Sequence, residues 1–170
     1  MTKFDAKKIA TLALYGAMAL VVFVVESLVP SLGVPGAKIG LANLFVLLAL
    51  YTFGVGEAFF VMLVKCVLGN LITGNLSSLT FSLFSGVMSL TVCALIFCLA
   101  KDKVSVVALS VVGAVISNIC QNAIYAFITQ TISVFFYLPY LTLTGVLGGL
   151  VVGFATVFVL RRLPKSIKQP

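Results

Sequence analysis

One stretch of the chain, from Val104 to Leu160, contains no charged residue. It is far longer than the roughly 20 apolar residues that one bilayer-spanning helix needs, and its length suits two helices with a break near residues 131–136. The rest of the 170 residues is similar, because 62% of the sequence is hydrophobic and only 9% is charged. A soluble domain carries about 25% charged residues. The sequence therefore predicts an integral membrane protein.

Apolar stretches recur along the whole chain and predict one all-α integral membrane domain over residues 1–170. Turn-forming or charged residues separate the stretches, for instance at residues 74–78 and 101–103. The alternating ten-residue segments of a membrane β-barrel are not present. The second stretch is short for a full span, and a partly re-entrant helix is the alternative for it. The six expected helices cover about residues 9–29, 38–53, 57–73, 79–100, 104–130 and 137–160.

Lysine and arginine are distributed unevenly over the predicted loops. Six spans place both termini on one side, and cytoplasmic loops are richer in Lys and Arg than external ones. The side of the termini would carry Lys3, Lys7, Lys8, Lys101, Lys103, Arg161, Arg162, Lys165 and Lys168, and the opposite side only Lys38. We therefore expect a multi-pass protein of the cell membrane with both termini in the cytoplasm. The net charge of +7 then reflects topology and anionic lipid headgroups, and no nucleic-acid partner is expected.

Polar side chains inside the predicted spans gather at middle and outer depths. Ionisable groups in a membrane are costly and usually face a cavity or another charge. We expect a pocket open to the outside, and its candidate ligand-binding residues are Lys38, Asn43, Lys65, Asn70, Ser117, Asn118, Gln121 and Asn122. Lysines among amides suit a small ligand that carries an anionic group and other polar atoms.

The alternative is that these side chains only join helices to one another. Asn and Gln form hydrogen bonds between membrane helices, and the Asn/Gln cluster fits that role as well as a ligand site. Glu26 or Glu57 would then neutralise Lys65. For Lys65 a ligand-facing role is the better interpretation, because a neutral residue would pack more easily at that depth.

The sequence lacks residues on which several chemistries depend. It has no histidine, no GxxxxGK[ST] phosphate-binding loop, and only the isolated aspartates Asp5 and Asp102. Its four cysteines lie in apolar stretches without CxxC spacing, which is typical of reduced, packed thiols. We therefore expect no catalytic residue, no metal site and no cofactor, and a protein that is not an enzyme.

Small residues recur at four-residue spacing in two predicted helices. Ala13 and Ala17 form one pair, and Gly145, Gly149 and Gly153 form a longer series. This spacing lets helix backbones approach closely. We expect the glycines to pack within the chain, whereas the alanine pair is either a docking surface for a partner or a chance pattern.

Four motifs, taken together and in order, carry a family resemblance. They are PGAKIGLAN at residues 35–43, KCVLGNLITG at 65–74, GAVISNICQ at 113–121 and YLPYLTLTG at 137–145. They resemble the Gx transporter family, which is also described as heptaprenyl diphosphate synthase component I. The resemblance covers nearly the whole chain. The six-helix architecture of that family is similar to the S components of energy-coupling factor (ECF) vitamin transporters.

The resemblance implies a division of labour between subunits. An S component captures a micronutrient from outside, and a separate transmembrane coupling subunit and an ATPase pair supply the energy. The expected ligand is vitamin-like or isoprenoid-related, and Ala13 and Ala17 match the small-residue pair that docks the coupling subunit in those S components. The sequence departs from the family at Lys65, where arginine is common, and at Ser117, where histidine is common.

Two other functions remain open from the sequence. The chain can be a non-catalytic membrane partner of an isoprenoid or quinone-pathway enzyme, or of a flavin-based membrane electron-transfer system. It can also be a channel or secondary carrier that acts alone. The second is less favoured, because many carriers contain internal repeats and none is evident here.

Overall fold

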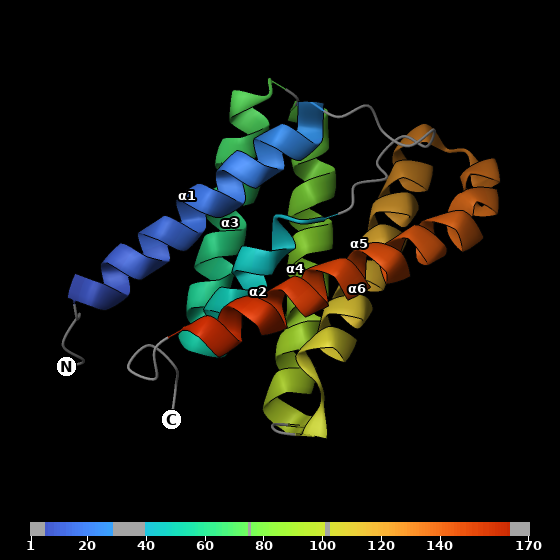
Figure 1. Cartoon of the computed structure of the whole chain (residues 1–170). Helices are drawn as coiled ribbons and strands as arrows, with labels where there is room; N and C mark the ends of the chain where they lie inside the picture. Colours follow the sequence, from blue (N-terminus) through green and yellow to red (C-terminus); the bar gives the residue numbers. More distant parts are fainter. Residues whose placement is uncertain (1–5, 29–39, 75, 101–102, 164–170) are drawn as a thin grey trace.

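The computed structural model describes residues 6–28, 40–74, 76–100 and 103–163, and these residues are helical almost throughout (Figure 1). They contain no β-strand, which confirms the predicted all-helical class. The elements are α1 (Ala6–Leu28), α2 (Asn43–Thr52), α3 (Val55–Ile72), α4 (Leu76–Ala100), α5 (Val106–Thr129), the short 3₁₀ helix η2 (Ile132–Tyr137) and α6 (Leu138–Arg162).

Five of the helices are long and apolar enough to cross a membrane, and α2 is not. The five candidate spans are Ala6–Leu28, Val55–Ile72, Ser78–Ala100, Val106–Thr129 and Ser133–Arg162. The 10 residues of α2 cover about 15 Å, which is half of a typical hydrocarbon core. The helix expected at about residues 38–53 is helical over Asn43–Thr52, and residues 40–42 form a turn before it begins.

A contact with α1 determines where α2 begins. Gly40 has φ +79, a left-handed conformation that favours glycine, and its carbonyl accepts from the Asn43 N–H at 2.9 Å. The carboxylate of Glu26, near the end of α1, accepts from the Leu41 N–H at 2.8 Å and from the Ala42 N–H at 3.4 Å. The first amides of a helix lack partners within the helix, so this carboxylate stabilises the start of α2.

Successive helices along the chain alternate in direction. We call the end of the bundle where α3 and α5 begin the lower end, as it is drawn in Figure 1, and the end where they finish the upper end. α1 also begins at the lower end, where α4 and α6 finish. α2 is the buried centre, since Phe45 to Leu50 are each at most 9% exposed. α1 packs on α2 and α3, while α5 packs between α4 and α6.

Glycines allow α6 to approach α5 closely. A Cβ atom added at Gly149 would lie 2.6 Å from Val111 Cα, and one added at Gly153 would lie 2.8 Å from Val107 Cα. Both distances are shorter than van der Waals contact, so the α5 backbone occupies the space of the missing side chains. The expectation that these glycines pack within the chain is thus confirmed for α6.

Replacement of Gly149 by alanine is expected to destabilise the bundle by about 1–3 kcal/mol, because the new methyl group would overlap the α5 backbone. Thermal unfolding of the purified protein in detergent measures the loss. Gly16→Ala in α1 is the matched control, since its methyl group would meet Val64 Cγ1 at an ordinary 3.6 Å. Alanine is also the better helix former, so this control should keep or gain stability. Equal melting temperatures for the two variants would contradict the packing argument.

Candidate functional site: a polar chamber and an adjoining aliphatic chamber

A cavity of about 60 Å³, which we call the polar chamber, lies between the helices, with walls from the upper part of α1, α4 and α6, the start of α2 and the middle of α3 and α5. Polar side chains from several helices therefore surround this cavity. Its lining residues are Phe23, Glu26, Gly40, Ala42, Asn43, Lys65, Cys66, Ser82, Ser85, Gly86, Ala114, Ser117, Asn118, Gln121 and Gly145. Five of the eight residues predicted from the sequence as ligand contacts are among them.

Lys65 is the cation of the polar chamber. It lies in the middle of α3, is 6% exposed, and donates a hydrogen bond to Asn43 Oδ1 at the start of α2. In the part of the chain that the structure describes, the one ion pair joins Lys8 to Glu57 near the lower end. Glu57 is therefore engaged away from Lys65, and no described carboxylate oxygen lies within 4.0 Å of the Lys65 ammonium.

Glu26 also lines the polar chamber, whereas the sequence suggested it only as a possible partner for Lys65. Both of its carboxylate oxygens accept from backbone amides that precede α2. The chamber thus holds one acidic and one basic side chain, and the hydrogen bonds described for each of them run to other groups. The sequence feature that could have identified Glu26 is its position on the same face of α1 as the buried Tyr15 and Ala19.

Three residues of α5 bring amide and hydroxyl groups to the chamber. The Nδ2 of Asn118 donates to the Leu141 carbonyl of α6 at 2.8 Å, which leaves its Oδ1 without a hydrogen bond among the described residues. The Nε2 of Gln121 lies 3.3 Å from Ser85 Oγ and 3.4 Å from Ser117 Oγ. These contacts position α5 against α4 and α6, and they leave acceptor oxygens at the chamber wall.

The sequence did not single out Ser85 or Ser82 of α4. Serine in a helix commonly bonds to a carbonyl of its own helix, and Ser85 Oγ does lie 3.4 Å from the Ser82 carbonyl. Only its 1% exposure and its contact with Gln121 set it apart from the other serines of α4.

Three other predicted contacts are not in the polar chamber. Asn70 donates to the Cys66 carbonyl at 2.6 Å within α3, and Asn122 donates to the Val134 carbonyl of η2 at 3.3 Å. Both side chains are buried, and their Oδ1 atoms have no partner among the described residues. Lys38 lies outside the described residues. A ligand contact for these three stays a prediction.

The alanine pair of α1 faces away from the bundle. Ala13 and Ala17 are exposed, as are Leu14 at 56% and Met18 at 44%. This face is therefore open to lipid or to another protein, and its docking role stays a prediction.

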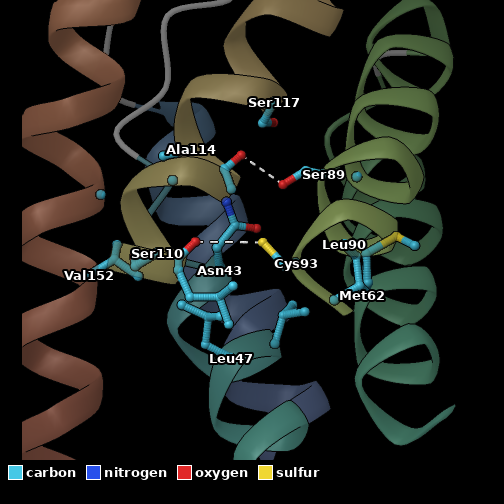
Figure 2. A pocket seen from close by; sticks show the side chains of 16 residues that line it. Asn43, Leu47, Met62, Ser89, Leu90, Cys93, Ser110, Ala114, Ser117 and Val152 are labelled. Atoms are coloured by element: carbon cyan, nitrogen blue, oxygen red, sulfur yellow. Dashed lines mark hydrogen bonds between the residues drawn. The ribbon is translucent and has the colours of Figure 1, made fainter. Parts of the chain in front are cut away.

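A second cavity, of about 50 Å³, adjoins the polar chamber (Figure 2). Five residues line both: Gly40, Asn43, Gly86, Ala114 and Ser117. We call the second cavity the aliphatic chamber, because most of its other walls are apolar: Val46, Leu47, Met62, Leu90, Leu109 and Val152. Figure 2 shows Asn43 amid the lining side chains, with Ser117 at one end and Leu47 and Met62 toward the other.

Two polar side chains of the aliphatic chamber are bonded to backbone carbonyls. Ser89 Oγ donates to the Gly113 carbonyl at 2.7 Å, and the Cys93 thiol donates to the Leu109 carbonyl at 3.6 Å. Ser110 adds one hydroxyl group to the wall. In the described residues, no three His, Cys, Asp or Glu side chains gather as metal ligands would.

Comparisons with known proteins give a match to one protein family. A search of curated proteins returns no match. The family model described as heptaprenyl diphosphate synthase component I matches residues 15–159. This segment includes every lining residue of both chambers. The chain belongs to the heptaprenyl diphosphate synthase component I family.

Proposed function

We propose that the chain is a non-catalytic membrane subunit of the ECF S-component type, which captures a small anionic ligand and passes it to a coupling subunit driven by separate ATPases. The observation that carries the proposal is Lys65. Its ammonium lines a cavity, and its described hydrogen-bond partner is a neutral amide oxygen. A buried charge is stable only with good partners, so this ammonium favours a ligand that brings a negative charge.

The half-length helix α2 supports a transport role. It begins beside the polar chamber and level with Lys65, to which Asn43 is bonded. Transporter sites are commonly built where a discontinuous helix starts near the bilayer midplane, and the partial positive charge of a helix N-terminus favours anions. The amides that precede α2 already donate to the Glu26 carboxylate, so the preference of the site for an anionic ligand rests on Lys65.

The basic residues support an outward-facing polar chamber. Lys7 and Lys8 start α1, and Arg161 and Arg162 finish α6, so all four lie at the lower end. By the positive-inside rule the lower end is cytoplasmic and both termini are inside. The polar chamber, toward the upper end, then receives its ligand from outside the cell.

A second candidate function follows from the family description. It names a component of a prenyl diphosphate synthase, which favours a membrane partner for a catalytic subunit. In that function the chain would hold a catalytic prenyltransferase, or a flavoprotein of electron transfer, at the membrane. Both candidates predict a partner, and they differ in which one.

The partner is tested with the face that carries Ala13 and Ala17. The tagged full chain, purified in mild detergent from its native membranes, is expected to carry an ATPase pair and a coupling subunit, identified by mass spectrometry. The double variant Ala13→Leu, Ala17→Leu should recover at least about tenfold less of them, because larger side chains block close helix approach. Ala123→Leu, at an exposed alanine of α5, is the control and should recover them fully. Recovery of a prenyltransferase or a flavoprotein in place of the ATPases would contradict the S-component assignment.

A further inference from the structure

We propose that the ligand is a small amphipathic anion, whose charged head binds in the polar chamber and whose short apolar tail extends into the aliphatic chamber. This inference rests on the proposed function, because it names the class of ligand for the same site. It starts from the arrangement of the two chambers, which have five lining residues in common.

The chambers lie one after the other along the bundle. The polar chamber takes Ser82 from the upper part of α4 and Gln121 from the later part of α5. The aliphatic chamber takes Cys93 from farther down α4 and Leu109 from the beginning of α5. A ligand that enters from the upper end therefore meets the polar groups first, and its far end points toward the lower half.

The walls of the two chambers differ in what they can bind. Lys65, Gln121 and Asn118 present a charge and amide groups to the polar chamber. In the aliphatic chamber, the hydroxyl of Ser89 and the thiol of Cys93 are already bonded to backbone carbonyls, and the remaining surface is mostly aliphatic. Burial of a hydrocarbon tail against such a surface is favourable, whereas burial of a second charged group is not.

The volumes limit the size of the ligand. A water-sized group needs about 10–15 Å³ of such a cavity. The 60 Å³ of the polar chamber therefore accommodates roughly four to six such groups, which is about the size of a carboxylate with a bound water or of a single phosphate. The 50 Å³ of the aliphatic chamber accommodates a tail of about four carbon atoms. A long lipid chain does not fit within these walls.

Chain-length dependence of binding tests the tail. The full chain in lipid nanodiscs is titrated by calorimetry with inorganic phosphate and with methyl, n-butyl and n-octyl phosphate. Acetate, pentanoate and nonanoate form a parallel series that distinguishes a phosphate from a carboxylate head. Each added methylene should strengthen binding about fourfold up to roughly four carbons, with no further gain for the longest member. Nanodiscs without the protein give the nonspecific uptake by lipid, which is subtracted.

The aliphatic chamber is tested with a variant that fills it. In the phosphate series, Val152→Phe should reduce the ratio of n-butyl phosphate affinity to inorganic phosphate affinity at least tenfold. In the carboxylate series, the corresponding ratio is that of pentanoate affinity to acetate affinity. Leu147→Phe is the matched control, because Leu147 is on the same helix but 57% exposed, and its ratio should equal that of the unaltered chain. The series on the unaltered chain needs no variant, so a misfolded Val152→Phe does not prevent the test.

The possible results separate the two proposals. Specific binding of the head groups without any gain from a tail would overturn the amphipathic ligand and leave the anion site in place. A gain that continues to the longest chain would overturn the limit that the aliphatic chamber sets on the length of the tail. No specific binding by any member of either series would contradict the proposed function itself, together with this inference.

Discussion

Replacement of Lys65 by methionine is expected to lower the affinity for an anionic ligand about a hundredfold or more, with the helical bundle intact. Removal of one partner of a buried charge pair costs about 2–5 kcal/mol of binding free energy. The same change removes a buried ammonium whose described hydrogen-bond partner is Asn43, so the unliganded protein should be as stable as before or more stable. Calorimetric titration with inorganic phosphate, n-butyl phosphate and pentanoate measures the loss, and thermal unfolding measures the stability.

Two further variants test whether the loss of affinity comes from the missing charge of Lys65. Lys65→Arg keeps the positive charge and should retain most of the affinity, although the planar guanidinium has a different geometry. Lys103→Met removes a lysine that is exposed at the lower end, before α5, and should change nothing. Equal affinity in Lys65→Met and Lys103→Met would contradict the assignment of the polar chamber as an anion site.

Glu26→Gln is expected to change affinity and stability in opposite directions. The carboxylate shares the polar chamber with Lys65, so it repels an anion bound there. Its removal should raise the affinity for phosphate or pentanoate at least about tenfold, because two unit charges less than about 12 Å apart at an effective dielectric constant of about 20 interact by more than about 1.4 kcal/mol. The same change weakens the hydrogen bonds to the Leu41 and Ala42 amides and should cost about 1–2 kcal/mol of stability.

The opposite signs of the two effects distinguish charge removal from a general loss of packing. A variant that merely loosens the bundle would lose both affinity and stability. Glu57→Gln is the control, since that carboxylate pairs with Lys8 near the lower end and should leave anion affinity unchanged. The same titrations measure both variants. An unchanged or weaker affinity in Glu26→Gln would place the bound anion away from this carboxylate.

The membrane class and part of the site could be predicted from the sequence for a simple reason. Charged and amide residues are so scarce in this chain that each one inside a span stands out, and Asn43, Lys65, Asn118 and Gln121 do line one chamber. The physical cost of a buried polar group is what makes such residues informative.

The start of α2 and the exact set of lining residues depend on tertiary contacts, which the spacing of residues in the sequence does not reveal. Apart from Gly40, no residue directly before Asn43 marks a helix start, so the sequence pattern predicts a start near residue 38. The hydrogen bonds from the Leu41 and Ala42 amides to Glu26, on another helix, stabilise the observed start. Asn122 is one turn beyond Asn118 on α5, yet its amide donates to η2, because the rotation of a helix against its neighbours decides which polar residues reach a cavity. Ser85 resembles any serine that bonds to its own helix.

The most direct test of a ligand site in the polar chamber is mass spectrometry of the small molecules that the chain carries out of its native membranes. The unaltered chain, Lys65→Met and Lys103→Met are purified in parallel, and the molecules released on denaturation are compared. We expect an acidic small molecule in the unaltered chain and in Lys103→Met, and its loss from Lys65→Met. The same content in all three preparations, including none, would contradict the account.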